Sequence, residues 1–256
     1  MAITLIDSHC HLDASEFDAD RDAVLARAQA AGIAAQVIPA VDAASWPALR
    51  ELCRVHADLH PAWGLHPIFL QRHRHEHIDA LRDWLQHDRP VAVGECGLDF
   101  WLPDLDRAQQ LHYFEAQLRL AREFDLPLIL HARKALDEVT AALRRIGGLR
   151  GVLHSFSGSR EQAQALWKLG FHLGIGGPVT YPRASRLRSI VADMPIKWLL
   201  LETDSPDQPL HGHQGRRNEP ERLADVLASV AELRGEDAAA VAAATTANAR
   251  TLFQLV

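Results

Sequence analysis

Ile3-Thr4-Leu5-Ile6-Asp7-Ser8-His9-Cys10-His11 is an apolar run that ends in two histidines separated by one residue. Alternate residues of a strand point to the same side, so His9 and His11 can hold one metal ion between them. Neutral imidazole is the commonest protein ligand for zinc-like cations. A polar strand end explains such a pair equally well when it stands alone, and the rest of the chain must decide between the two interpretations.

Short apolar runs of this kind alternate with longer amphipathic stretches along the whole chain. We predict eight strands, over Thr4–Asp7, Ala35–Pro39, Ala62–Gly64, Val91–Gly94, Leu128–Leu130, Gly151–Leu153, His172–Gly174 and Lys197–Leu201. Strand followed by helix, repeated eight times, predicts the α/β class and a single (β/α)8 TIM barrel, with residues 1–256 as one domain. The Ala-rich stretch Glu236–Val256 adds a helical tail at the C-terminus. A doubly wound parallel sheet is the alternative.

Composition narrows the class of protein. Of the 256 residues, 48% are hydrophobic and 23% charged, as in ordinary globular proteins. We find no apolar run of about 18 residues and no signal-peptide pattern, so we expect a cytoplasmic protein with no membrane partner. Three cysteines without a CxxC motif argue against a disulfide framework. The net charge of -6 opposes a broad basic surface for duplex DNA.

Histidines and carboxylates follow five of the predicted strands, and these residues are His9 and His11, Glu95 and Asp99, His131, His154, and Glu202 and Asp204. In a parallel barrel the carboxyl ends of the strands share one mouth, so these side chains would converge there. Unrelated strand ends would have no need of a histidine or carboxylate at almost every position. The pattern therefore favours a shared metal site over a set of structural caps.

Three further residues are candidates for substrate binding. Arg133 lies two residues after His131, so it would face the same mouth, where its planar guanidinium suits a phosphate. His66 closes the third strand and is a candidate for contact with a phosphate of the substrate. Ser157 precedes a predicted helix whose N-terminus could hold an anion, and helix capping is the alternative role for this serine.

In order along the chain, these motifs resemble the signatures of the TatD family of metal-dependent hydrolases, a branch of the amidohydrolase-like barrels. The segments that carry the resemblance are DSHCHL (7–12), GLHP (64–67), GECGLD (94–99), LPLILHAR (126–133), HSFSGS (154–159), LLLETDSP (199–206) and RNEP (217–220). The family usually has Tyr after GLD. Phe100-Trp101 stands there instead, and these rings could stack on a base.

The resemblance implies two divalent cations per chain, Mg²⁺, Mn²⁺ or Zn²⁺. It assigns one ion to His9, His11 and Asp204, and the second to His131 and His154, with Glu95 bridging the pair. By the same analogy Asp204 takes the proton of the attacking water, and Asp204 and Glu95 are the catalytic carboxylates. Paired metals can hold the nucleophile and stabilise the leaving oxygen of a phosphodiester.

The resemblance further implies a deoxyribonuclease, a 3'-5' exonuclease on single-stranded or frayed DNA. Because the net charge is negative, we expect DNA to be held locally at the metal mouth by few phosphates, with Arg133 assisted by Arg183 or Arg217. We expect a monomer without an obligate protein partner. An ester or amide hydrolase, acting on an aminoacyl ester or small lactone, is the second hypothesis, since the same metals polarise carbonyls. A non-catalytic binding module is the third.

Overall fold

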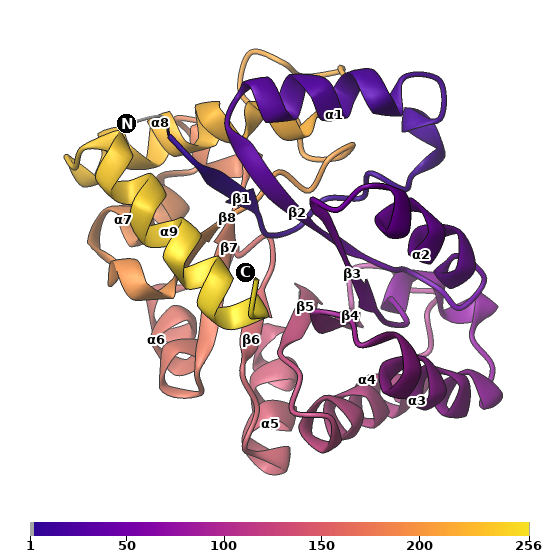
Figure 1. The fold of residues 1–256 in the computed structure, drawn as a ribbon. Helices are drawn as coiled ribbons and strands as arrows, with labels where there is room; N and C mark the ends of the chain where they lie inside the picture. Colours follow the sequence, from indigo (N-terminus) through magenta and orange to yellow (C-terminus); the bar gives the residue numbers. More distant parts are fainter. Residues whose placement is uncertain (1–2, 256) are drawn as a thin grey trace. The chain divides into compact units, whose positions relative to one another are not determined.

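Residues 3–255 are described by a computed structural model of the chain (Figure 1). Met1 and Ala2, at the start of the predicted domain, and Val256, at the end of the predicted helical tail, lie outside the described residues. Eight parallel strands alternate with helices and form one sheet in their order along the chain. The fold is therefore of the (β/α)8 barrel class, as predicted, and not a doubly wound sheet.

The strands are β1 (Leu5–Asp7), β2 (Ile33–Pro39), β3 (Leu59–Trp63), β4 (Ala92–Asp99), β5 (Leu128–Arg133), β6 (Gly151–Leu153), β7 (Phe171–Ile175) and β8 (Leu199–Leu201). The helices are α1 (Arg21–Ala30), α2 (Trp46–Val55), α3 (Glu76–Asp88), α4 (Arg107–Glu123), α5 (Leu136–Ile146), α6 (Arg160–Lys168), α7 (Ser185–Asp193), α8 (Leu223–Arg234) and α9 (Ala238–Phe253). Helix α9 confirms the predicted C-terminal helix.

Five strands are longer than predicted, and β4 and β5 gain the most residues at their carboxyl ends. The interpretation that the fourth strand ends at Gly94 is wrong, because β4 continues through Glu95 to Asp99. Its pairing with β5 continues as well, as far as Asp99 opposite Arg133. The residues expected in loops after these strands therefore lie within a hydrogen-bonded ladder, which holds them more rigidly than a loop would.

By their internal contacts the residues divide into two compact units. The first extends from the start of the chain to Ile38 and adds Ser155–Arg160 and all residues from His172 onward. The second consists of Pro39–His154 and Glu161–Phe171. That residues 1–256 form a single domain stays a prediction.

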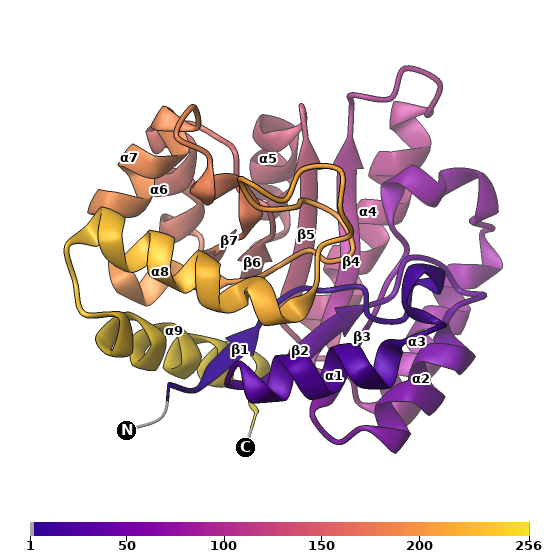
Figure 2. The ribbon, with the colours of Figure 1, turned by 90° about the horizontal axis from the view of Figure 1, so that it is seen from above.

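In the first unit, β1 pairs with β2 and β7 pairs with β8. The ends of β1 and β8 are joined by backbone hydrogen bonds from Ser8 N to Leu201 O (3.0 Å) and from Asp204 N to His9 O (2.9 Å). Helices α8 and α9 pack against β1, beside which Figure 2 shows them. The unit thus brings the N-terminal strand to a strand that follows it by nearly 200 residues.

In the second unit, β3, β4, β5 and β6 pair in sequence order. Helices α2, α3, α4 and α5 pack on these strands. Trp46 and Trp63 are fully buried and both contact the ring of Trp84, at centroid distances of 5.6 and 5.1 Å. Aromatic pairs of this kind bury a large apolar area and fix the helices on the sheet.

Two further features concern the length of the helices and the state of the cysteines. Within residues 3–255, no helix combines the length and the apolar character that crossing a membrane requires. All three cysteines are thiols, and Cys10 and Cys96 are buried.

Gly97 provides a test of the ladder between β4 and β5. Its φ of +151° is unfavourable for other residues, and a Cβ there would overlap the carbonyl oxygen of His131. We expect Gly97→Ala to lower the free energy of unfolding by at least about 2 kcal/mol, measured by urea denaturation.

Gly212→Ala is the matched control, because Gly212 also has a positive φ (+87°) but a Cβ there meets nothing within 4 Å. Equal losses in the two variants would show that the close approach to His131 does not constrain β4.

Candidate metal centre

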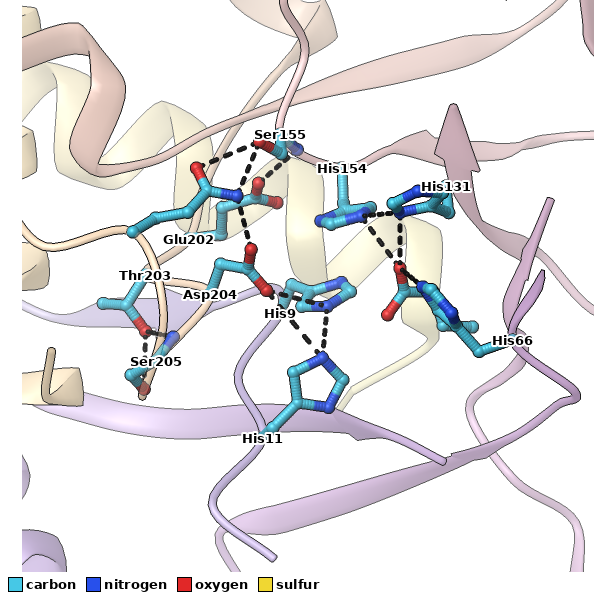
Figure 3. A network of polar contacts seen from close by, with 12 residues as sticks. His9, His11, His66, His131, His154, Ser155, Glu202, Thr203, Asp204 and Ser205 are labelled. Carbon is cyan, nitrogen blue, oxygen red and sulfur yellow. Dashed lines mark hydrogen bonds and ion pairs between the residues drawn. The ribbon is translucent and has the colours of Figure 1, made fainter. Parts of the chain in front are cut away.

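A first cluster of side chains of metal-ligating types lies in the first unit. His9 and His11 follow β1, and Asp204 follows β8. The Nε2 atoms of the two histidines are 3.1 Å apart, and Asp204 Oδ1 lies 3.4 Å from the first and 3.8 Å from the second. Figure 3 shows the three side chains pointing toward one another. We call His9, His11 and Asp204 the first triad.

Asp7 holds the backbone of this triad in place. Its carboxylate is fully buried and accepts hydrogen bonds from His9 N (3.2 Å), Thr203 N (3.0 Å) and Thr203 Oγ1 (2.6 Å). Burial raises the pKa of Asp7 to about 7, although these hydrogen bonds act in the opposite direction. One buried side chain thus ties the segment that carries His9 to the segment that carries Asp204.

A polar network continues from Asp204 toward β7. The second carboxylate oxygen of Asp204 accepts a hydrogen bond from the Gln208 amide, which also donates to Ser155 Oγ (2.7 Å). Ser155 N in turn donates to the fully buried Glu202 (2.5 Å). A Cβ at Gly174 in β7 would overlap the Glu202 carboxylate, so this glycine makes room for it.

The sequence places Glu202 at the shared mouth without a defined role, and it gives no role to Ser155 or Gln208. The available signal was the spacing of Glu202 and Asp204, which matches that of His9 and His11. Ser155 is in contact with the network, whereas Ser157, the predicted anion contact, is exposed and its carbonyl oxygen accepts a hydrogen bond from Arg186 (3.0 Å). The substrate role of Ser157 stays a prediction.

A second cluster lies in the second unit and consists of Glu95 from β4, His131 from β5 and His154, which follows β6. Glu95 Oε1 lies 2.9 Å from His154 Nε2 and 3.2 Å from His131 Nδ1, and the two ring nitrogens are 3.2 Å apart. Ligand atoms around a tetrahedral zinc ion, at about 2.0–2.1 Å from it, are separated by about 3.3 Å. We call Glu95, His131 and His154 the second triad.

Asp99 fixes the orientation of His131. Its Oδ2 lies 3.2 Å from His131 Nε2, the ring nitrogen on the side away from Glu95. Burial lowers the pKa of His131, but hydrogen bonds to Asp99 and Glu95 outweigh burial and raise it overall. A neutral His131 that donates from Nε2 to Asp99 leaves the Nδ1 lone pair available, the usual arrangement of a metal-ligating histidine.

His66 contacts the same glutamate but plays a different part. Its Nδ1 accepts a hydrogen bond from Ile68 N (3.1 Å), so in the neutral ring the proton is on Nε2. Nε2 lies 2.9 Å from Glu95 Oε1 and therefore donates to it. A protonated nitrogen has no lone pair for a metal, so we assign the buried His66 as a positioning residue for Glu95. Its predicted contact with substrate stays a prediction.

Both triads fit a divalent cation. Each offers two imidazole nitrogens and one carboxylate oxygen, a donor set that suits Zn²⁺ and Mn²⁺. Glu95 is 1% exposed and Asp204 is 7% exposed. Burying carboxylates is costly unless a positive charge compensates, and a divalent ion supplies that compensation.

The candidate arginines have different surroundings. The exposed Arg133 places its guanidinium over the Trp101 ring, 5.0 Å from the ring centroid. Arg217 forms a two-pronged ion pair with Asp20, at 2.8 Å for each contact, and a third with Glu219. Arg183 lines a pocket of about 440 Å³ together with Tyr181, Pro182, His211 and Gln214. Arg217 is thus engaged by carboxylates, while Arg133 and Arg183 are at the surface.

Comparison with known proteins agrees with this chemistry. A family model described as "TatD related DNase" matches residues 6–254. The uncharacterized metal-dependent hydrolase YjjV of Escherichia coli (strain K12) is 42% identical over 259 residues, which cover 100% of both chains. The 3'-5' ssDNA/RNA exonuclease TatD of Erwinia tasmaniensis is 36% identical over 98% of this chain and 100% of that protein.

The crystal structure of YjjV, a TatD homologue from Escherichia coli K12, superimposes with a TM-score of 0.94 at 40% identity, covering 98% of each chain. A hydrolase of the TatD family from Entamoeba histolytica has the same fold, with a TM-score of 0.87 at 21% identity and 98% of each chain covered. The chain belongs to the TatD-related DNase family of metal-dependent hydrolases.

Proposed function

We propose that this chain is a 3'-5' exonuclease on single-stranded or frayed DNA and that each triad holds one divalent cation. The observation that carries the proposal is the second triad, in which Asp99 sets the tautomer of His131 and His66 donates to Glu95. A catalytic metal site needs its ligands fixed in this way before the metal arrives. The relatives named 3'-5' ssDNA/RNA exonuclease support the same activity and make RNA a second substrate to test.

The side chains of the two triads have two tasks, metal binding and proton transfer. When bound, divalent ions lower the pKa of water and polarise a phosphate ester. Asp204 accepts the proton of the attacking water, and the Gln208 amide, bonded to its second oxygen, keeps the carboxylate turned in one direction. Glu95 is held by His66 and serves its triad as the carboxylate ligand. That Glu95 also bridges two ions stays a prediction from the family resemblance.

Basic residues lie next to the second triad in the sequence. They favour a phosphodiester as the substrate class. Arg133 is the last residue of β5, the strand that carries His131, and Lys134 follows it; both are exposed. A phosphate gains charge-assisted hydrogen bonds from such groups, whereas a neutral ester gains much less. The hypothesis of an ester or amide hydrolase lacks a feature of this kind. Each triad has two imidazoles and one carboxylate that can bind a metal. A complete set of this kind argues against a non-catalytic binding module.

The proposal includes a cytoplasmic monomer whose partner is nucleic acid. Three cysteines that are present as thiols suit a reducing compartment. With a net charge of -6, binding of DNA should involve few phosphates and depend only weakly on salt.

The activity is tested with metal-stripped protein reconstituted with Mg²⁺, Mn²⁺ or Zn²⁺. The substrates are single-stranded DNA with a label at the 5' or the 3' end, RNA, a chromogenic phosphodiester and an aminoacyl ester. We expect metal-dependent release of nucleotides from the 3' end of single-stranded DNA. Robust turnover of the ester without cleavage of either nucleic acid would overturn the proposal in favour of the carbonyl hydrolase.

Asp204→Asn tests the proton acceptor. An amide keeps the size of the side chain and one oxygen for a metal but cannot take a proton, so kcat on single-stranded DNA should fall by at least about 100-fold. Asp207→Asn, at an exposed position three residues later, is the matched control. Metal content is measured in both variants. Turnover of Asp204→Asn close to that of the wild type would refute its role.

Asp99→Asn tests the orientation of His131. Loss of the carboxylate that holds His131 Nε2–H should weaken metal binding by about 10- to 100-fold, measured by competition with a chelator. The exposed Asp104→Asn in the following loop is the control and should bind metal like the wild type. Unchanged affinity in Asp99→Asn would mean that packing alone orients the imidazole.

A further inference from the structure

Trp101 has an exposed aromatic ring and lies two residues after the end of β4. The residue is 55% exposed, and among residues 3–255 the other large exposed apolar residues are aliphatic. An exposed tryptophan is unusual, because its large apolar surface is normally removed from water. A ring that remains in water at the end of a strand that carries site residues is suited to a ligand with a flat face.

The position of this ring is fixed by the residues that build the second triad. Trp101 N donates a hydrogen bond to Asp99 Oδ1 (2.9 Å), while the other oxygen of Asp99 contacts His131. Phe100 N donates to Arg133 O (2.8 Å), which extends the ladder between β4 and β5 by one residue. The carboxylate that orients a metal ligand thus also anchors the backbone of Trp101.

Two cations lie against the indole. Arg133 Cζ is 5.0 Å and Lys134 Nζ is 5.7 Å from the ring centroid. Lys134 has a φ of +56°, an uncommon conformation for a residue with a side chain and one that concentrates at functional sites. Cation–π contacts at exposed positions are weak, and stacking of a nucleobase on tryptophan is stronger, so a base can displace a cation from a face of the ring.

We propose that Trp101, Arg133 and Lys134 form a subsite for one nucleotide of a single-stranded substrate, next to the phosphate that is cleaved. The base stacks on the indole of Trp101, and the phosphate of that nucleotide pairs with Arg133 and Lys134. The inference rests on the proposed nuclease function and adds a selectivity for unpaired bases. A paired base is already stacked in the duplex and cannot lie on the ring, so double-stranded DNA has to fray first.

The test compares binding of two oligonucleotides by the metal-loaded protein. Both are single-stranded phosphorothioates that resist cleavage, and one lacks the base of the nucleotide next to the 3'-terminal linkage. Fluorescence anisotropy gives each affinity. We expect the wild type to bind the complete oligonucleotide at least about 5-fold more tightly than the abasic one.

Trp101→Ala should bring this ratio close to one, and Trp101→Phe should restore part of it because a smaller aromatic face remains. Lys134→Ala should weaken binding of both oligonucleotides by a similar factor, since it removes a phosphate contact. Lys168→Ala, an exposed lysine in the last turn of α6, is the control and should match the wild type. Thermal unfolding confirms that each variant is folded.

A wild-type ratio near one, or a ratio that Trp101→Ala leaves unchanged, would overturn the subsite. Because these affinities do not depend on turnover, the outcome is separate from that of the nuclease assay. A preference for the complete oligonucleotide in a protein that cleaves no nucleic acid would support the subsite and refute the proposed function.

Discussion

The pairing of β4 with β5 is the constraint on which the second triad depends. This ladder extends to Asp99 opposite Arg133 and requires Gly97, because any side chain there would collide with the backbone of His131. Glu95, Asp99 and His131 are therefore held by strands rather than by loops. Metal ligands on strands keep their geometry more accurately than ligands on flexible segments, which is what a preorganised site needs.

In the first unit, hydrogen bonds to a buried carboxylate position the triad. A buried carboxylate, Asp7, accepts hydrogen bonds from the backbone of both segments that carry ligands, so the positions of His9 and Asp204 are coupled. Gln208 and Ser155 then restrict the Asp204 side chain itself. In each unit a carboxylate outside the triad positions a triad residue. Asp7 acts through the backbone of His9, and Asp99 acts through an imidazole nitrogen of His131.

Much of this arrangement could be predicted from the sequence, because apolar runs mark the strands and the ligand residues follow them. The end of the fourth strand could not be predicted in this way. Gly94 and Gly97 are typical of a turn, and only the register with β5 shows that the strand continues. The proton on His66 Nε2 depends on a hydrogen bond from Ile68 N that no pattern encodes. Spacing placed Arg133 beside His131, but the long side chain lies over Trp101, a contact formed only in the folded chain.

The central claim is that the two triads, each with two imidazoles and one carboxylate, are metal sites. The most direct measurement is anomalous diffraction from crystals soaked in Mn²⁺. The account predicts two anomalous peaks, one within bonding distance of His9, His11 and Asp204 and the other within bonding distance of Glu95, His131 Nδ1 and His154. A single peak under saturating Mn²⁺, or a second ion bound by His66 Nε2, would contradict it.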